Sequence, residues 1–381
     1  MDLNQIRTEI DKVDEELVAL YKKRMSLSAS VAEYKKANNI PVLDSSRERE
    51  LLTKISNLSG EEFDLYTRTL YSTILDLSRA YQHKILGNTS KLRSDIETAL
   101  NDTPKIFPEC ATVACQGVEG AYSQIAAEKL FRVPSITYFS NFNAVFSAIE
   151  AKMCKYGILP IENSTAGSVK QVYDLMKKHN FKIVRSVRIK IDHNLLAKKG
   201  TKLSDIKEIF SHEQAIDQCS KFLATLPSDV KITRVENTAM AALMVAMSDR
   251  TDVASISSCF CANQYGLSIL SSAIQDNGNN QTRFICISND LEIFPGADKT
   301  SLMLVTPHKP GSLYKILSRF NSLGINLIKL ESRPIPERNF EFMFYFDLET
   351  SVYSERLSDL LAELEQVCDD FTYLGTYSEV V

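Results

Sequence analysis

The sequence has no tryptophan, five histidines that do not cluster, and eight cysteines that never form a CxxC pair. It also lacks any apolar run near the roughly 18 residues that span a bilayer, and its opening stretch, MDLNQIRTEIDKVDEEL, contains no apolar signal core. These absences argue against a membrane protein, a disulfide framework and a zinc site. We therefore expect a cytoplasmic protein with reduced thiols, no bound metal and no membrane contact.

An excess of charge of one sign is also missing. The 381 residues carry 44 Lys and Arg against 48 Asp and Glu, a net charge of −4, and the pI is near 5.9. The first 86 residues hold 13 basic and 14 acidic side chains, whereas a nucleic-acid-binding domain is usually basic. Nucleic acid is therefore not an expected partner, and the length suits two or three domains.

Apolar residues from Leu3 to Tyr34 follow a 3,4,3,4 spacing without Gly or Pro, which predicts one helix of about 35 residues. Two more helices are predicted, from Ser45 to about Leu58 and from Glu61 to about Leu86. A helix about 50 Å long cannot bury its apolar stripe alone. We therefore expect residues 1–88 to form a three-helix domain within an intertwined homodimer. The stripe consists of Leu3, Ile6, Ile10, Val13, Leu17, Leu20, Leu27, Val31 and Tyr34.

The rest of the chain has two other patterns. Residues 89–110 are polar, contain one short helical pattern and include Pro104 and Pro108, which predicts a linker. From 111 to 290, β-rich runs such as YGILPIE alternate with helical patterns, which predicts an α/β domain whose ligand lies at the strand ends. Residues 300–381 are predicted to run strand, helix, strand, strand, helix, strand, the order of an α+β ferredoxin-like domain.

Two cations in the first segment occupy positions where a helix bundle would be apolar. Arg24 falls on the apolar stripe, and Lys35 lies three turns further along the same face. A buried charge without a counter-charge costs several kcal/mol, so we expect an anion beside them. Alternatives stay open, because Arg24 could extend to solvent and Ser45-x-x-Glu48 matches a helix capping box.

In residue type and spacing, residues 1–88 resemble the all-helical class of chorismate mutases. The resemblance implies that Arg24 and the partner subunit's Arg7 bind the two carboxylates of chorismate, while Lys35 and Gln82 donate to its ether oxygen. Rearrangement to prephenate then needs only a fixed conformer and stabilised negative charge, without nucleophile, metal or cofactor. The matching positions are Arg7, Arg24, Lys35, Asp44, Arg47, Glu48, Ser78 and Gln82, with Arg47 near a carboxylate and Asp44 and Glu48 near the ring hydroxyl.

Four stretches of the middle segment lie where a predicted strand meets a loop: CQGVEGAYSQIAAEKLF, ILPIENSTAGSV, FSHEQAIDQCSKF and GNNQTRFICIS. Helix capping alone could explain Glu162-Asn163-Ser164 and Ser211-His212. Together, however, the four stretches resemble prephenate dehydratase, an enzyme with two subdomains and a cleft. Prephenate loses CO2 and water, and aromatisation of the ring drives the reaction.

The resemblance to prephenate dehydratase also implies roles for single residues. Thr282 would assist departure of the hydroxyl, and Glu162 is a rival proton source because a threonine hydroxyl is a very weak acid. Arg283 would anchor a carboxylate. The residues that would position the substrate are Asn163, Ser164, Ser211 and Gln218.

The third segment contains PHKPGSL and KLESRP, which are similar to the two elements by which ACT domains of phenylalanine-sensitive dehydratases bind the amino acid. The resemblance implies that L-phenylalanine binds between paired ACT domains and inhibits the dehydratase. A surface ion pair between Glu331 and Arg333 is the alternative. The residues implied in binding are Gly311, Ser312, Leu313, Glu331, Ser332 and Arg333.

The whole chain thus resembles bifunctional chorismate mutase/prephenate dehydratases of phenylalanine biosynthesis. We expect a homodimer, possibly a tetramer, that uses no cofactor. Two alternatives remain: a non-catalytic amino-acid-sensing protein, and a dehydratase that acts on arogenate. The inward-facing Arg24 and Lys35 argue against the first, because a helix that only dimerises gains nothing from two cations facing its core.

Overall fold

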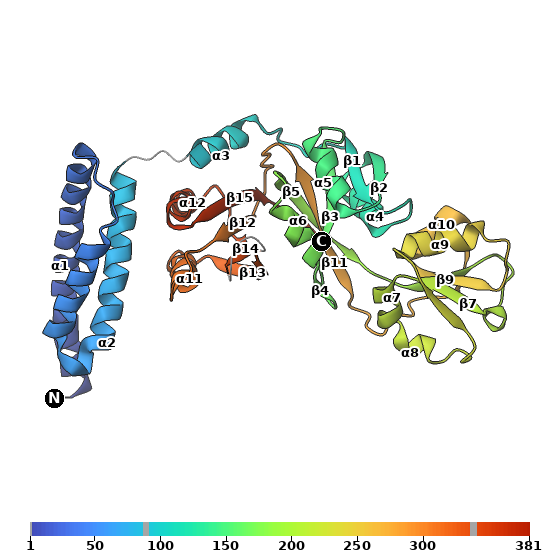
Figure 1. Ribbon diagram of the computed structural model, residues 1–381, viewed down its shortest axis with the longest axis horizontal. Coiled ribbons are helices and arrows are strands. Elements are labelled where there is room, and N and C mark those ends of the chain that lie inside the picture. Colours follow the sequence, from blue (N-terminus) through green and yellow to red (C-terminus); the bar gives the residue numbers. More distant parts are fainter. Residues whose placement is uncertain (1, 87–90, 336–340) are drawn as a thin grey trace. The chain divides into compact units, whose positions relative to one another are not determined.

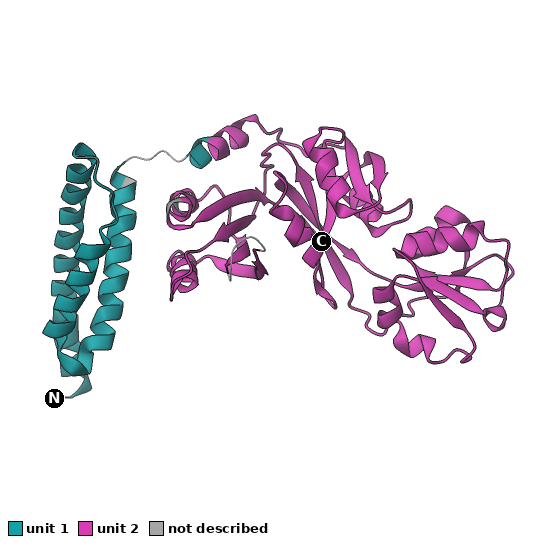
Figure 2. Cartoon of the chain, in the orientation of Figure 1, with its two compact units in different colours: residues 1–94 teal, residues 95–381 magenta. Residues whose placement is uncertain are grey.

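The computed structural model describes residues 2–86, 91–335 and 341–381. The chain divides into two compact units, residues 1–94 and 95–381 (Figure 2). The first is built from helices, whereas the second is built on three sheets. Among the described residues, no helix combines the length and the apolar character needed to cross a bilayer.

Two long helices make up most of the first unit (Figure 1). α1 (Leu3–Ala37) has 35 residues and begins after the N-cap Asp2, whose side chain accepts from the backbone N–H of Gln5. It confirms the single long helix predicted for this stretch. α2 (Ser45–Ile85) is interrupted at Gly60, whose φ of +71° and ψ of 169° are not helical. Because glycine reaches this φ without strain, the two further predicted helices are present as the two arms of α2.

The apolar stripe of α1 is not covered by the other described residues of the first unit. Ser28 and Ala32 are the buried residues of α1, and both lie off the stripe. The stripe residues Leu3, Ile10 and Leu20 are 62%, 53% and 67% exposed. A long row of exposed apolar side chains is typical of a surface that a partner covers.

The second unit begins within α3 and contains a mixed sheet in the order β16-β5-β11-β3-β1-β2, with β4 paired to β3. β1 runs parallel to β2 and β3, whereas β11 is antiparallel to β3 and β5. α3 lies inside the predicted linker and confirms its short helical pattern. The elements are α3 (Lys91–Asp102), β1 (Cys110–Gln116), α4 (Tyr122–Leu130), β2 (Val133–Phe139), α5 (Phe142–Glu150), β3 (Tyr156–Asn163), β4 (Gly167–Ser168), α6 (Lys170–Met176), β5 (Lys182–Lys190), β11 (Gln281–Ser288) and β16 (Glu379–Val380).

A second sheet, in the order β10-β6-β9-β7-β8, forms the other lobe of this α/β region (Figure 1). Residues 191–193 and 272–280 connect the two sheets, because β5 leads into β6 and β10 leads into β11. The elements are β6 (Asn194–Ala197), η1 (Leu203–Asp205), β7 (Glu208–Ser211), α7 (Glu213–Gln218), α8 (Ser220–Leu223), β8 (Lys231–Arg234), α9 (Thr238–Met247), β9 (Val253–Ser257), α10 (Cys259–Tyr265) and β10 (Ser268–Ser271).

The helical pattern over 214–226 does not form one helix. It splits into α7 and α8 at Cys219, which has φ −113° and ψ 21°. The cause is Asp276, whose carboxylate accepts from the Lys221 N–H at 3.1 Å and from the Ser220 hydroxyl at 2.7 Å. This carboxylate comes from the connection between β10 and β11, so a new helix start is capped by a residue distant in sequence.

The C-terminal part follows the predicted strand, helix, strand, strand, helix, strand order. Its four strands form an antiparallel sheet in the order β13-β14-β12-β15. The elements are β12 (Lys299–Val305), α11 (Ser312–Ser322), β13 (Asn326–Pro334), β14 (Phe342–Glu349), α12 (Glu355–Val367) and β15 (Asp370–Tyr377).

This C-terminal sheet shares a hydrophobic core with the first sheet of the unit. Met303, Tyr345 and Leu374 pack in one cluster with Tyr173 and Ile183. Gly375, at φ +142°, permits the closest approach, because a Cβ there would lie 2.3 Å from the Ile183 carbonyl oxygen. The chain then returns to the first sheet, where β16 pairs in parallel with β5.

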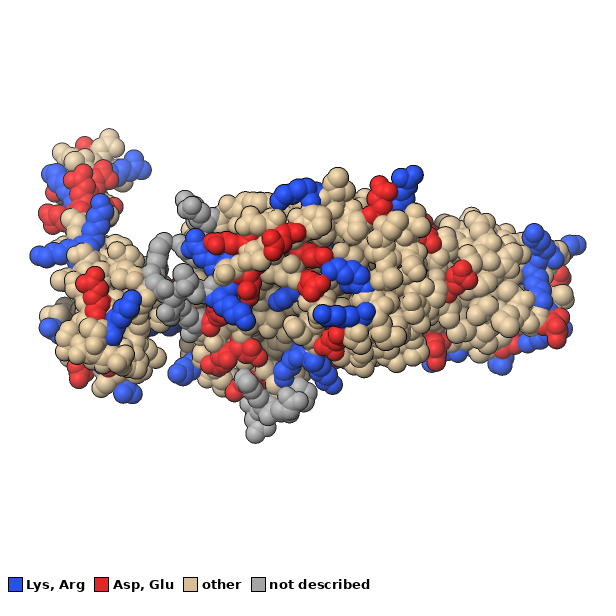
Figure 3. All heavy atoms as spheres, turned by 90° about the horizontal axis from the view of Figure 1, so that it is seen from above, with Lys and Arg blue, Asp and Glu red and all other residues tan. Residues whose placement is uncertain are grey.

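Basic and acidic side chains are interspersed on the face drawn in Figure 3. In the part of the chain that the structure describes, no three His, Cys, Asp or Glu side chains are grouped as metal ligands. All eight cysteines are free thiols.

Candidate active sites

Arg24 is joined to two buried polar residues inside the helical unit. Its Nη1 donates to Ser78 Oγ at 2.5 Å, and Ser78 is 4% exposed. Gln82, one turn further along α2, is 7% exposed, and its Oε1 has no hydrogen-bond partner among the described residues. A buried acceptor without a donor is costly, so the site is suited to a ligand that donates or bridges to it.

The inward cations of this unit lack carboxylate partners. Lys35 Nζ donates to the Val42 carbonyl at 2.5 Å, and Arg24 contacts the Ser78 hydroxyl. In the described part of the chain, neither forms an ion pair with Asp or Glu. Both are half-buried, so their charges are only partly solvated. An anion from outside the chain would supply the counter-charge that Arg24 and Lys35 lack.

Glu48 has a partner that the sequence did not suggest. The Arg79 guanidinium forms an ion pair with Glu48. It forms a second ion pair with Asp76, which lies one helical turn before Arg79. Asp44, rather than Ser45, caps α2, since its carboxylate accepts from the Arg47 N–H at 3.0 Å. The capping box considered for Glu48 is therefore not formed.

Two of the predicted mutase residues are turned to the surface. The Arg47 side chain is 71% exposed and lies 3.3 Å from Glu50. Arg7 is exposed on α1. Neither is brought near Arg24 by this chain alone.

A cavity of about 480 Å³ lies between the two sheets of the α/β region. It opens where β1, β3, β7 and β8 end and β11 begins, which is the edge at which α/β folds bind ligands. Three predicted residues line it: Asn163, Gln218 and Thr282. The other lining residues are Gln116, Tyr122, Phe142, Pro160, Ala166, Gly167, Ser168, Val169, Gln171, Ile191, His193, His212, Gln214, Ala215, Glu236, Asn237, Thr238 and Phe284.

Asn163 fixes the hydroxyl of Thr282. Its Nδ2 donates to Thr282 Oγ1 at 2.9 Å and to Asn280 Oδ1 at 2.8 Å, while its Oδ1 accepts from the N–H groups of Thr165 and Ala166. All four hydrogen-bonding positions of the amide are used, so its orientation is determined. Because Thr282 Oγ1 accepts from Asn163, its own proton is available to a ligand.

The hydrogen-bond chain continues from Asn280 to His193. Gln218 Oε1 accepts from Asn280 Nδ2 and lies 2.9 Å from His193 Nε2. His193 is 2% exposed, and burial lowers its pKa below the ordinary value. Neither Asn280 nor His193 was predicted, although both lie in the segments that connect the two sheets.

No lysine or arginine is present among the described residues that line this cavity. Positive potential comes instead from backbone N–H groups, because α4 and α9 begin at the cavity with Tyr122 and Thr238. Asn237 caps α9 by accepting from Met240 N at 2.7 Å. Burial raises the pKa of the Tyr122 phenol far above its ordinary value, so its hydroxyl stays neutral and donates to the Asp192 carbonyl.

Four other predicted residues of the dehydratase site lie outside the cavity lining. The Ser211 hydroxyl donates to the Ile256 carbonyl at 2.9 Å, and the Ser164 hydroxyl donates to the Asn279 carbonyl at 3.1 Å. Both hold backbone segments in place. Glu162 and Arg283 are neighbours of Asn163 and Thr282, and in a strand neighbouring side chains point to opposite faces.

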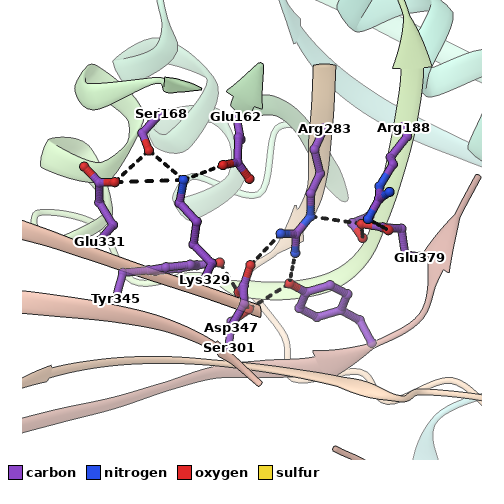
Figure 4. A network of polar contacts seen from close by, with 12 residues as sticks. Glu162, Ser168, Arg188, Arg283, Ser301, Lys329, Glu331, Tyr345, Asp347 and Glu379 are labelled. Atoms are coloured by element: carbon purple, nitrogen blue, oxygen red, sulfur yellow. Dashed lines mark hydrogen bonds and ion pairs between the residues drawn. The ribbon is translucent and has the colours of Figure 1, made fainter. Parts of the chain in front are cut away.

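That opposite face meets the C-terminal sheet (Figure 4). Arg283 Nη1 lies 2.5 Å from Asp347 and its Nε lies 3.0 Å from Glu379, while Glu162 lies 2.5 Å from Lys329 Nζ. Lys329 also donates to the hydroxyl of Ser168, which in turn donates to Glu331 at 2.6 Å.

A second cavity, of about 510 Å³, lies at the start of α11. Gly311, at φ +80°, is the N-cap of this helix, and Ser312 and Leu313 follow it into the lining. The other lining residues are Thr306, Pro307, His308, Lys309, Pro310, Tyr314, Glu341, Phe342 and Phe344.

The KLESRP residues do not line this second cavity. The Arg333 guanidinium pairs with Asp174 through two contacts of 2.8 Å, and Glu331 faces Ser168. Ser332 is exposed on the opposite side of β13. The surface pair considered between Glu331 and Arg333 is not formed, because each contacts the α/β region instead.

Family models match both enzyme regions: "Chorismate mutase type II" over residues 6–83 and "Prephenate dehydratase" over residues 113–292. A bifunctional chorismate mutase/prephenate dehydratase of Aquifex aeolicus is 31% identical over 382 residues, covering 100% of this chain and 99% of that protein. Arogenate dehydratase 2 of Petunia hybrida is 36% identical over 282 residues, 70% of this chain and 71% of that protein.

Among solved structures, the chain resembles prephenate dehydratase of Arthrobacter aurescens in complex with L-Phe. The TM-score is 0.64 at 29% identity, over 70% of this chain and 89% of that one. The two family models occupy the two units whose sites are described above, and the Aquifex relative matches along its full length. The chain therefore belongs to the family of bifunctional chorismate mutase/prephenate dehydratases of phenylalanine biosynthesis.

Proposed function

We propose that the helical unit binds chorismate at Arg24 and Lys35 and rearranges it to prephenate. The carrying observation is that these two half-buried cations face inward without a carboxylate partner in the described chain. Arg24 binds one carboxylate with Ser78 orienting it, and Lys35 and Gln82 bind the ether oxygen where negative charge grows. For Gln82 this requires that its Nε2 faces the substrate.

The mutase site is completed by a second copy of the chain. Support comes from the exposed stripe of α1 and from Arg7, which lies on the same helix and reaches no group of its own site. In a homodimer that buries the stripe, the partner's Arg7 supplies the second cation for the dianion, and Arg47 turns from Glu50 to the substrate. Light scattering after size-exclusion chromatography tests this, and a monomer at micromolar concentration would contradict it.

The α/β cavity converts prephenate to phenylpyruvate. Thr282 donates its hydroxyl proton in a hydrogen bond to the departing hydroxyl, Asn163 holds Thr282, and Gln218 Nε2 with the N-terminal N–H groups of α4 and α9 binds carboxylates. The hydrogen bond from Asn163 to Thr282 carries this assignment, since it leaves the threonine proton free to donate. Glu162, Ser164, Ser211 and Arg283 then support the site without contacting the substrate.

The two activities are tested in separate assays, by following prephenate formation from chorismate and phenylpyruvate formation from added prephenate. Arg24→Ala should lower the mutase rate at least about 100-fold and leave the dehydratase unchanged. Thr282→Ala should lower the dehydratase rate at least about 100-fold and leave the mutase rate unchanged. Thr282→Ser should retain most of the dehydratase activity because it keeps the hydroxyl. Equal loss of both rates in either variant would show misfolding or shared machinery rather than two sites.

L-Phenylalanine binds the cavity at the start of α11, in a C-terminal domain of the ACT type. The ring would pack on Phe342 and Phe344, with the carboxylate at the Gly311 and Ser312 N–H groups. Inhibition requires that the ligand favour one arrangement of the C-terminal sheet. Lys329 and Glu331 contact Glu162 and Ser168, so the C-terminal sheet is directly linked to strands β3 and β4 beside the dehydratase site. A movement of the sheet would therefore act on these strands.

Arogenate is a second candidate substrate for the α/β cavity. It carries an amino group where prephenate carries a keto group, and Glu236 is the one carboxylate among the described lining residues. If Glu236 pairs with that ammonium, Glu236→Gln should lower kcat/KM for arogenate about tenfold and leave prephenate unaffected. An unchanged ratio of the two kcat/KM values would remove Glu236 as the partner of the ammonium, and no turnover of arogenate by the wild-type protein would remove this candidate substrate.

A further inference from the structure

His193 is a buried titratable group at the dehydratase cavity that was not predicted. It lies in the connection from β5 to β6 and is 2% exposed. Gln218 Oε1 can only accept, and it also accepts from Asn280 Nδ2, so the hydrogen in the 2.9 Å contact belongs to His193 Nε2. Nδ1 is then the basic nitrogen, and it is buried without a hydrogen-bond partner among the described residues.

The proposed dehydration consumes a proton. Dianionic prephenate yields monoanionic phenylpyruvate, CO2 and hydroxide, so the hydroxide must be protonated to leave as water. Thr282 can donate a hydrogen bond but is too weak an acid to give up its proton. Glu162 is paired with Lys329 on the other side of the strand. A proton source inside the cavity is therefore still required.

When the substrate is bound, its negative charge joins Asp192 and the Gln218 contact in favouring a proton on His193 Nδ1, against the effect of burial. Asp192 lies beside His193 and pairs with Lys190 at 3.0 Å, while Tyr122, His212 and Glu236 face the same cavity from α4 and from the segments before α7 and α9. Burial lowers the pKa of His193, against the Gln218 contact and Asp192, which raise it. A dianion that enters a cavity whose described lining holds no lysine or arginine also raises that pKa, against the lowering by burial.

We propose that His193 is the general acid of the dehydratase, an inference that rests on the proposed function of this cavity. Binding of prephenate brings a proton onto Nδ1. The bond from the ring to the carboxylate breaks and its electron pair enters the ring, the para C–O bond breaks, and the departing hydroxide takes the proton from Nδ1. Water and CO2 leave, and neutral His193 regains its proton from solvent. Thr282 holds the same oxygen by its hydrogen bond.

His193→Gln tests the proposal, because glutamine can still donate to Gln218 but does not titrate. We expect kcat for prephenate to fall at least about 100-fold. An acid works only when protonated, so wild-type kcat should decline as pH rises through the pKa of His193 in the complex, and this decline should be absent from the residual activity of the variant. A wild-type kcat that is flat from about pH 6 to 9 would overturn the proposal without any variant.

His193→Asn serves as a second variant without a titrating side chain, and His179→Gln serves as the control. His179 lies outside the cavity, with its Nδ1 2.9 Å from Glu150, and its variant should keep the wild-type pH profile. Mutase activity and thermal unfolding report folding. If a folded His193 variant loses rate but keeps the pH-dependent decline, the residue only positions Gln218 and the proposal is wrong. Wild-type protein that forms no phenylpyruvate would instead overturn the function proposed for the cavity.

Discussion

Replacing Arg283 by methionine distinguishes a docking residue from a substrate anchor. Arg283 points toward Asp347 and Glu379 (Figure 4). The two contacts are 2.5 and 3.0 Å long, and the Asp347 and Glu379 side chains are 1% and 5% exposed. Without the guanidinium, the buried Asp347 carboxylate loses its cation and Glu379 keeps only Arg188, and removing one partner of a buried pair costs about 3–5 kcal/mol. For a unit of this size, that corresponds to a fall of roughly 6–20 °C in Tm.

The assay is thermal unfolding combined with prephenate kinetics. Asp347→Leu should destabilise the protein by a similar amount, and the double variant should lose less than the sum, because neither charge of that pair is left alone. Arg188→Met is the matched control, since Arg188 also pairs with Glu379, at 2.7 Å, but is 43% exposed and should contribute under about 1 kcal/mol. KM for prephenate should stay within about threefold in the folded variants.

A different pattern would refute this reasoning. If Arg283→Met raised KM for prephenate about 100-fold or more while its Tm and the Asp347→Leu kinetics stayed normal, Arg283 would be a carboxylate anchor. The guanidinium would then have to leave Asp347 and cross to the other face of β11 during catalysis.

Three further predictions concern the second unit. Gly375→Ala should destabilise it by about 2 kcal/mol or more, measured by thermal unfolding, because the new Cβ meets the Ile183 carbonyl. Glu208, held at a pKa of about 2 by Thr233 and its cationic neighbours, stabilises the fold above its ordinary pKa. Glu208→Gln should lower Tm by roughly 2–4 °C at pH 7, and this difference should vanish as pH falls below about 2. Phe342→Ala should weaken L-phenylalanine binding about tenfold by calorimetry without changing the uninhibited rates.

Sequence periodicity was enough to place the inward residues of the helical unit. A helix repeats every 3.6 residues, so Arg24, Ser78 and Gln82 could be assigned to core-facing positions, and the structure places them there. Arg79 was missed because it falls beside Ser78 on a partly exposed flank, where a charged residue is unremarkable from sequence. Only the fold shows that Glu48, thirty-one residues earlier, lies against it.

The α/β site could be predicted only in part, for a reason that lies in sheet geometry. Alternation determines that Thr282 and Arg283 point to opposite faces, but both faces of the central strand β11 are buried, so the pattern does not say which one holds a ligand. Which face of β11 holds a ligand depends on what packs against each face. One is closed by the C-terminal sheet, which meets Arg283 with Asp347, whereas the other opens to the cavity between the lobes. His193 and Asn280 gave no signal because the connecting segments that carry them have no period at all. The TRF motif therefore contains one residue that lines the cavity, Thr282, and one that contacts the C-terminal sheet, Arg283, so a displacement of that sheet would act on the strand that carries Thr282.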